Sequence, residues 1–225
     1  MVPAVRIAVV IPALDEAETV EAAIASARSA DEIVVVDGGS LDRTADRARA
    51  AGAQVLTSPR GRARQLDAGW RATGAEVLLF LHADTRLPLG WAAAVRDALA
   101  APGVAGGAFR LRFDERSPAM RIVEWGAQRR AAVAGLPYGD QALFVRRRVL
   151  EAIGGIPPVP IAEDLDLVRA MRAHGRLALL PLAVSTSARR YRKHGALRTW
   201  ARHAVALVAW RLGVDRERIA RWVRR

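Results

Sequence analysis

The chain has 225 residues, a length typical of one domain, and 52% of them are apolar, which is enough for a substantial core. It contains no cysteine, which excludes disulfide bonds and thiolate metal sites, and no apolar run is long enough to predict a membrane-spanning helix. The net charge of +12 is carried by arginine, since Lys193 is the only lysine. Because the chain is also rich in alanine, the arginine content is of the kind that a GC-rich genome produces, and the charge alone is weak evidence for nucleic-acid binding.

Strand and helix patterns alternate through the first half of the chain. Apolar runs predict buried strands at residues 7–11, which Pro12 ends, at 32–37, at 54–57 and at 77–84. Helices are predicted between them, at about 15–29, 41–51 and 62–73. Uninterrupted apolar strands that alternate with helices are typical of a parallel sheet covered on both faces. The sequence therefore predicts an α/β fold with a Rossmann-like, nucleotide-binding first half and a mostly parallel central sheet.

The pattern changes after Pro88 into a mixed α+β arrangement laid against the first half. Residues 106–113 alternate as an exposed strand does, and further strands are predicted at 141–145 and 177–180. Helices are predicted at 88–100, 117–134, 148–153 and 165–174, with one long helix from residue 196 onward.

Acidic residues stand where predicted strands end. Asp37 and Asp84 each close an apolar run, and ligands of open α/β sheets bind beyond the carboxyl ends of the strands. A third acidic position, the pair Glu163-Asp164, follows a loop stiffened by prolines. Each also has a structural explanation, as a turn residue or as an acid at a helix N-terminus. The chain has no Walker loop, no Gly-x-Gly-x-x-Gly after its first strand and no His-Glu-x-x-His, which disfavours those site types.

Five segments, in order, resemble the motifs of glycosyltransferase family 2, inverting enzymes with the GT-A fold. They are Ile11-Pro12-Ala13-Leu14-Asp15-Glu16, the segment from Val36-Asp37-Gly38-Gly39-Ser40 to Thr44, residues 61–69, His82-Ala83-Asp84 and residues 163–169. Asp15 replaces the usual Asn, and His82 replaces the first Asp of the Asp-x-Asp motif. The resemblance spans roughly residues 7–191. Residues 61–65, 82–84 and 138–141 also resemble a small bacterial subgroup associated with arsenosugar or selenium gene clusters.

The resemblance implies a hexosyltransferase-type enzyme that moves a sugar from a nucleotide-diphosphate sugar, expected to be a UDP-sugar, to a hydroxyl acceptor. It implies a divalent cation, Mn²⁺ or Mg²⁺, that neutralises the leaving diphosphate, with Asp84 as ligand and His82 and His194 as further candidates. His82 could instead be a packed strand-end histidine, and Arg62 a solvated helix residue. The implied donor-binding residues are Pro12, Ala13, Asp15, Glu16, Asp37, Gly38, Arg62, Gln65, His82, Ala83, Asp84 and Arg190.

An inverting transfer needs a base that takes the proton of the acceptor hydroxyl. The resemblance implies Asp164 for this role, with Glu163 and Asp166 as competitors. The implied acceptor-binding residues are Gly139, Asp140, Gln141 and Tyr191. We accordingly expect one domain over residues 1–195, with a nucleotide-sugar-binding half at 1–87 and an acceptor half at 88–195.

Residues 196–225 are expected to form a basic amphipathic helix. The segment from Arg189 to Arg225 holds eleven Arg and one Lys against two acids. Three interpretations stay open for this helix: an interfacial membrane helix, a homodimer contact, or a helix packed on the core. With no secretory signal expected, we predict a cytoplasmic protein, or one held on the inner face of the membrane.

Two rival functions are a nucleic-acid-binding protein that uses the basic tail and a nucleotidyltransferase. The few aromatic residues lie on a predicted helix rather than on a sheet, which speaks against base stacking, so nucleic acid is not an expected partner. The Gly-rich, Lys-bearing start of a nucleotidyltransferase is missing.

Overall fold

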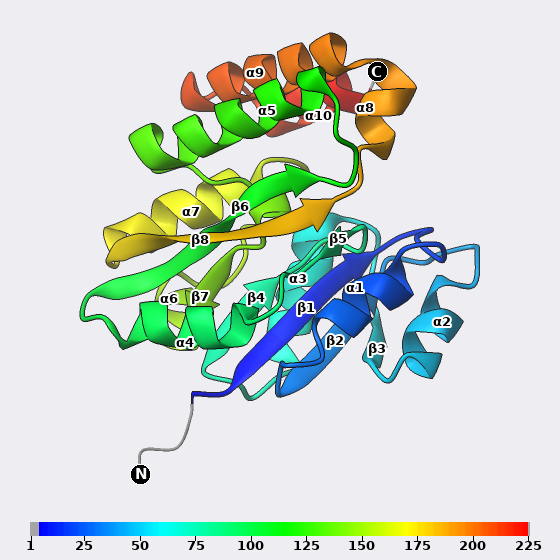
Figure 1. The fold of residues 1–225 in the computed structure, drawn as a ribbon, viewed down its shortest axis with the longest axis vertical. Coiled ribbons are helices and arrows are strands. Elements are labelled where there is room, and N and C mark those ends of the chain that lie inside the picture. The colour runs from blue at the N-terminus through cyan, green and yellow to red at the C-terminus, as the bar shows by residue number, and fades with distance from the viewer. Residues whose placement is uncertain (1–4, 225) are drawn as a thin grey trace.

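The computed structural model describes residues 5–224, with the backbone alone described for His194, Leu197 and Arg224. Its centre is an eight-stranded sheet with the order β3-β2-β1-β4-β7-β6-β8-β5, and helices cover both faces (Figure 1). The strands are β1 (Ile7–Ala13), β2 (Glu32–Asp37), β3 (Gln54–Thr57), β4 (Val77–Phe80), β5 (Thr85–Arg86), β6 (Val104–Phe113), β7 (Phe144–Arg146) and β8 (Arg176–Thr186).

The helices follow the order predicted from the sequence, with α8 and α10 as additions. They are α1 (Val20–Ser26), α2 (Thr44–Ala50), α3 (Arg62–Arg71), α4 (Trp91–Ala100), α5 (Pro118–Arg129), α6 (Arg147–Ala152), α7 (Glu163–Ala173), α8 (Arg189–His194), α9 (Ala196–Arg211) and α10 (Arg216–Arg224). A π-helical turn over Arg130–Ala134 continues α5, and a 3₁₀ turn spans Gly139–Gln141.

The first half is the predicted parallel unit. β1 pairs in parallel with β2 and β4, and β2 pairs in parallel with β3. Alternate side chains of β1 enter two cores: Ile7 and Val9 pack with α1 and α4, whereas Ala8 and Val10 pack with α3 and α7. Burial on both faces explains why this strand reads as an unbroken apolar run.

The second half turns the sheet antiparallel. β7 pairs antiparallel with β4 and β6, β6 pairs in parallel with β8, and β5 pairs antiparallel with β8. The prediction of an exposed strand at 106–113 is wrong for its first part, because β6 lies between β7 and β8 and its first six residues are buried. In its last part the predicted alternation is present, with Arg110 and Arg112 exposed. The prediction of a strand at 141–145 is wrong at its start, since Gln141 belongs to the 3₁₀ turn.

Pro12 does not end the first strand, contrary to prediction. Residues two apart on a strand form their hydrogen bonds with the same neighbouring strand. Since Val10 O accepts a hydrogen bond from Leu81 N–H, an N–H group at position 12 would also point toward β4. The last residue pair between β1 and β4 is Val10 with Phe80, so β4 has ended at that level. The missing N–H of proline therefore leaves no sheet partner unpaired.

Two helix predictions are also corrected. The helix predicted at 15–29 begins at Val20, because Asp15 has a φ of 53° and the N–H groups of Glu16 and Ala17 bond to the side chains of Thr44, at the start of α2, and Asp42. The single helix predicted from 196 onward is two helices, α9 and α10, separated at Gly213, which has a φ of 71°.

Glycines at the centre of β6 allow the strands to approach closely. A Cβ at Gly107 would overlap Ala178 O of β8, and a Cβ at Gly106 would overlap Phe144 O of β7. Neither obstacle is a flexible side-chain end, so relief would require the backbone of a neighbouring strand to move.

We predict that Gly107→Ala lowers the free energy of unfolding by more than about 2 kcal/mol, because it overpacks the sheet against backbone atoms. Gly126→Ala is the matched control, since Gly126 lies inside α5 with no atom near its added Cβ, and it should be neutral or stabilise by about 0.5–1 kcal/mol. Urea denaturation of both variants measures the difference. Equal stability of the two would contradict this account of β6.

Candidate active site

The predicted site residues gather beyond the carboxyl ends of β1, β2 and β4, where the N-terminus of α7 and the start of α8 approach (Figure 1). The loop after β1 and the loop after β2 are joined by hydrogen bonds. Ser40 Oγ accepts from Asp15 N–H at 2.9 Å, Asp15 Oδ1 accepts from Leu41 N–H at 2.8 Å, and Thr44 Oγ1 accepts from Glu16 N–H at 2.8 Å. These bonds fix Asp15 and Glu16 against the second loop.

Gln65 holds the same two loops from beneath. Its buried side-chain amide donates to Ala13 O and to Val36 O, each at 2.8 Å. The amide also lies against Gly38, where an added Cβ would come within 3.1 Å of it. Both N–H donors are therefore used inside the protein. The predicted contact of Gln65 with a donor stays a prediction, and its described role is to position the loops.

Asp37 closes the turn after β2. Its Oδ2 accepts from Gly39 N–H and from Ser40 N–H, each at 3.1 Å, and its Oδ1 accepts from the Ser40 hydroxyl. These bonds are those of a turn-forming aspartate. They occupy much of the carboxylate, so a ligand would meet Asp37 together with the turn that it stabilises.

Asp84 follows β4 and faces two arginines from α8. Burial raises the pKa of its carboxyl, and the guanidiniums of Arg189 and Arg190 oppose that rise. The Thr85 hydroxyl donates to Asp84 Oδ1 at a long 3.4 Å, which leaves the carboxylate available to a ligand. Arg189 also pairs with Glu16 Oε1 at 2.7 Å, so the first loop and α8 meet beside Asp84.

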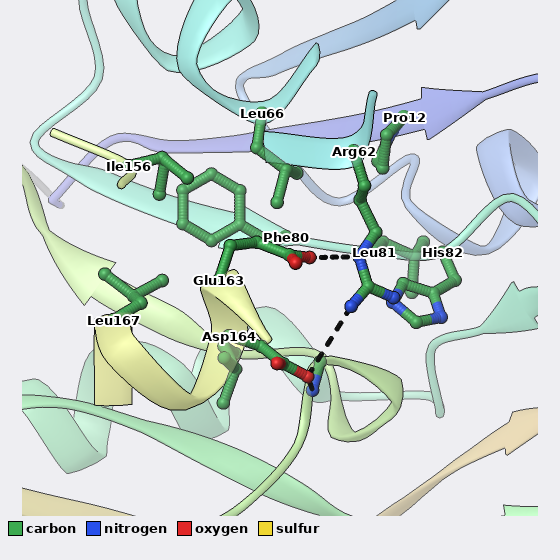
Figure 2. A pocket seen from close by; sticks show the side chains of 12 residues that line it. Pro12, Arg62, Leu66, Phe80, Leu81, His82, Ile156, Glu163, Asp164 and Leu167 are labelled. Atoms are coloured by element: carbon green, nitrogen blue, oxygen red, sulfur yellow. Dashed lines mark hydrogen bonds and ion pairs between the residues drawn. The ribbon is translucent and has the colours of Figure 1, made fainter. Parts of the chain in front are cut away.

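Arg62 lies at the centre of a second group, shown in Figure 2. Its guanidinium forms an ion pair and hydrogen bond with Glu163 and lies 3.7 Å from Asp164 Oδ2. Glu163 is only 3% exposed, so Arg62 supplies the charge that a buried carboxylate requires. The small pocket beside them, of ≈ 20 Å³, has an apolar wall that includes Leu66, Phe80 and Leu167.

His82 faces this group rather than Asp84. Its Nε2 lies 3.3 Å from Arg62 Nη1, and an added Cβ on Gly139 would come within 3.2 Å of it. Burial and the charge of Arg62 lower the pKa of the imidazole to about 3, so the ring is neutral near pH 7. The structure thus places the two ends of the His82-Ala83-Asp84 motif in different surroundings.

The three acids at the start of α7 have different partners. Asp164 accepts from Gly139 N–H at 2.8 Å through Oδ2 and from Leu165 N–H at 2.9 Å through Oδ1. Asp166 accepts from Trp210 Nε1–H at 2.7 Å and from the Arg216 guanidinium at 2.7 and 2.9 Å. Asp166 therefore fastens the C-terminal helices to α7, away from the pocket.

Asp140 forms the core of a third group. Among the described residues, its buried Oδ1 has no hydrogen-bond partner. Burial raises the pKa of its carboxyl to about 6, with Arg130 opposing the rise. Burial also raises the pKa of Tyr191 to about 12 and lowers that of His203 to about 4, and the two rings lie 6.3 Å apart. Several perturbed groups in one place are typical of a functional site.

Sequence reasoning missed Arg130 and His203. His203 lies on the inward stripe of α9, four residues after buried Thr199 and seven before buried Trp210, so helical periodicity could have found it. Arg130 has no such signal, because it enters the group through the π-helical turn. Gln141, predicted to bind an acceptor, is 1% exposed and its amide donates to Phe109 O at 3.0 Å.

The described residues suit a metal ion that is coordinated partly by the protein and partly by a bound ligand. They contain no group of three His, Cys, Asp or Glu side chains close enough to enclose a cation. Asp84 offers carboxylate oxygens that are not fully used, and Mg²⁺ in proteins is commonly held by one or two carboxylates together with substrate phosphates. The side chain of His194, the other predicted ligand, lies outside the described side chains.

Comparison with known proteins identifies the fold and the family. The family model described as Glycosyl transferase family 2 matches residues 8–152. Glucosyl-3-phosphoglycerate synthase of Mycobacterium tuberculosis, in a complex with Mn²⁺, UDP-glucose and phosphoglyceric acid, is 23% identical and has a TM-score of 0.66 over 94% of this chain and 81% of that chain. The same enzyme with Mg²⁺ and UDP is 21% identical, with a TM-score of 0.64 over 94% of this chain and 80% of that chain. No curated protein matches the chain.

These likenesses confirm the predicted GT-A fold, a mixed α/β arrangement around a curled eight-stranded sheet. At such low identity the structural likeness concerns the fold alone, whereas the family match covers well over half of the chain. The family match begins within β1 and covers every strand from β2 to β7 completely, but it does not reach α7, β8 or the C-terminal helices.

The raised pKa of Asp140 predicts a change in pH-dependent stability. The folded protein keeps this proton up to about pH 6, whereas an ordinary aspartate loses it near 3.8, so ionisation costs stability as the pH rises through that window. Asp140→Asn should therefore be the more stable protein above pH 6, by on the order of 2 kcal/mol, and should gain little below pH 4.

Thermal denaturation from pH 4 to 8 measures this difference. Asp97→Asn, on the exposed side of α4, is the matched control and should follow the wild type throughout. If Asp140→Asn also followed the wild type at every pH, the carboxyl of Asp140 would not be buried without a partner.

Proposed function

Because the chain belongs to glycosyltransferase family 2, we propose that it transfers a sugar from a UDP-sugar to an acceptor hydroxyl, with inversion at the anomeric carbon. The observation that carries the proposal is the position of Asp84, at the end of β4, beside two arginines of α8 and the joined loops after β1 and β2. A carboxylate beside paired guanidiniums suits a diphosphate and its cation. The UDP and UDP-glucose complexes of the mycobacterial enzyme support the choice of nucleotide.

The donor lies, in this proposal, across the rim formed by the first two loops. Asp37, Gly38, Asp15 and Glu16 face the nucleoside, with Pro12 and Ala13 beneath it. Arg190 and Arg189 neutralise the diphosphate, and Ala83 and Asp84 adjoin it. Gln65 contributes by holding the loops, because its amide is already used. The charge of Arg62 is already paired with that of Glu163, so in this proposal Arg62 lies beside the transferred sugar rather than binding the diphosphate.

A divalent cation, when bound, supplies neutralisation of the charge that grows on the leaving diphosphate. Asp84 would hold it together with donor phosphate oxygens, and His194 stays a candidate second ligand. Mn²⁺ and Mg²⁺ are both proposed, as each accompanies UDP in the mycobacterial structures. His82 stays a candidate too, since its imidazole is neutral, but it would have to turn away from Arg62.

Asp164 is the proposed base that takes the proton of the acceptor hydroxyl. It lies beside Gly139 on the wall of the pocket, whereas Glu163 is buried against Arg62 and Asp166 is occupied by Trp210 and Arg216. Both competitors are therefore positioning residues in this proposal. The hydrogen bond from Gly139 N–H holds one oxygen of Asp164 in place and leaves its second lone pair for the acceptor.

The acceptor is proposed to bind between Gly139 and Tyr191. Asp140 has a carboxylate oxygen without a partner among the described residues, and an acceptor hydroxyl would satisfy it. Gln141 shapes this wall by bonding to Phe109 O and Tyr138 N–H. The division into halves at residues 1–87 and 88–195 and membership of the arsenosugar- or selenium-associated subgroup stay predictions from sequence.

We predict that UDP raises the melting temperature more than GDP, CDP or ADP does, and that Mn²⁺ or Mg²⁺ increases the shift. At a ligand concentration of about 100 Kd, mass action adds about 2.7 kcal/mol, which is several degrees for a chain of this size. Asp84→Asn should lose the metal-dependent part of the shift, whereas the surface control Asp97→Asn should keep it. A metal-dependent UDP shift that survives in Asp84→Asn would remove Asp84 from the cation site.

We also predict that Asp164→Asn keeps the UDP shift and loses about 10²–10⁴-fold in turnover, since a general base contributes that much. UDP release from UDP-glucose, with a mixture of hydroxyl acceptors, measures turnover. Asp166→Asn is the contrasting variant: it should lower the melting temperature, because Trp210 and Arg216 lose their partner, and reduce turnover less. Wild-type turnover in Asp164→Asn would place the base elsewhere, with Asp140 as the next residue to test.

A further inference from the structure

Exposed apolar side chains are concentrated at one end of the molecule. Of the eleven large apolar residues that are exposed in the described part of the chain, eight belong to the helical layer of α5, α9 and α10 and the turns that follow the first two. They are Ile122, Trp125, Val133, Trp200, Val205, Val208, Leu212 and Trp222. This layer lies at the end of the molecule away from the N-terminus (Figure 1). Such gatherings of apolar side chains usually mark an interaction surface.

The two faces of α9 are both largely apolar. One face packs on the core through Ala209 and Trp210, which are 5% and 8% exposed. On the opposite face Val205, Val208 and Leu212 are 54–76% exposed, and their spacing of three and four residues places them on one stripe. A helix that only covers a core carries polar residues on its outer face, so this outer stripe is unexplained by the fold.

The neighbouring helix α5 has a similar outer face. Met120 and Val123 are buried against the end of β6, whereas Ile122, Trp125 and, one turn beyond the helix, Val133 are 62–77% exposed on the opposite side. The two helices are in contact, since Ala196 at the start of α9 packs on the same cluster as Met120. Their outer stripes are therefore parts of one surface layer.

The charges of this layer indicate its partner. Basic residues flank the stripes, with Arg202 and Arg211 on α9 and Arg129 on α5, and α9 contains no acidic residue. The one acid of α5, Glu124, turns inward and accepts from Phe113 N–H at 2.7 Å. A symmetric dimer through the outer stripes of α9 and α5 would bring arginines against arginines with no acid on either stripe to pair them, because an isologous contact uses the same patch twice. The exposed acids of the layer, Asp215 and Glu217, lie outside these stripes, just before and within α10. An anionic lipid surface offers negative charge and an apolar interior together.

We propose that the outer stripes of α9 and α5 dock the protein on an anionic lipid bilayer, with the helices lying in the interface. Trp125 and Trp200 suit this position, since tryptophan favours the boundary between headgroups and chains. No helix within residues 5–224 is long and apolar enough to cross a bilayer, so the contact is peripheral. This inference goes beyond the proposed function, because binding of a UDP-sugar does not require it.

Docking would place the acceptor side of the site next to the lipid. The inner face of α9 carries His203, whose ring lies 6.3 Å from that of Tyr191, while the outer face carries the exposed valines. One helix thus separates the group around Asp140 from the bilayer surface.

The test is sedimentation of the full chain with vesicles of phosphatidylcholine alone or with about a third phosphatidylglycerol. The wild type should bind the anionic vesicles and bind the neutral ones more weakly. Val208→Glu with Leu212→Glu should reduce binding to anionic vesicles at least about tenfold, since charges then enter the interface. The matched control is Leu41→Glu with Leu89→Glu, two leucines that are 97% and 98% exposed outside this layer, and it should bind as the wild type does.

Equal binding of the two double variants, or a wild type that ignores anionic vesicles, would overturn the proposal. A dimer seen by analytical ultracentrifugation that Val208→Glu with Leu212→Glu dissociates, without vesicle binding by the wild type, would assign the layer to self-association instead. The UDP thermal shift of that variant should equal the wild-type shift, which shows that it is folded and separates this test from that of the proposed function.

Discussion

The buried ion pair between Arg62 and Glu163 joins the two halves of the molecule at the site. Arg62 starts α3 of the parallel half, and Glu163 starts α7 of the other half. A carboxylate that is 3% exposed is costly without a partner, and loss of one member of such a pair typically costs about 3–5 kcal/mol. This requirement fixes the distance between the helices, and with it the position of Asp164 opposite His82. The sheet joins the two halves through β4 and β7, and this ion pair sets how α3 and α7 meet above it at the site.

The acids of the site differ in their surroundings more than in their chemistry. Asp166 is saturated by Trp210 and Arg216, Glu163 by Arg62, and Asp37 by the turn that it closes. Asp84 and Asp140 are left with unused oxygens, and burial raises the pKa of both. A buried carboxylate with an unused oxygen has capacity for a ligand, and in the proposed function these two lie on the donor side and the acceptor side respectively.

The parallel half can be predicted well from the sequence. Strands β1, β2 and β4 are buried on both faces, so they consist of consecutive apolar residues, and the acids at their ends are easy to recognise. The second half can be predicted less well. The glycines of β6 weaken its pattern, yet they are required by the backbone of β7 and β8, which are distant in sequence. The roles of Gln65 and Asp166 could not be predicted from the sequence either. The hydrogen-bond partners of Gln65 are 29 and 52 residues away along the chain, and those of Asp166 are 44 and 50 residues away. Local periodicity carries no information on such pairings.

The C-terminal helices connect the site with the outer surface. Asp166 anchors Trp210 and Arg216, so α9 and α10 are fixed to the same helix that presents Asp164. The helix that covers the acceptor side is thus held firmly on its inner face, although its outer face exposes apolar residues that add nothing to the core. Exposed apolar residues of this kind lower solubility, and they are usually found where another surface covers them. An acceptor that resides at that surface would need no long diffusion path, because the group around Asp140 lies directly beneath the helix.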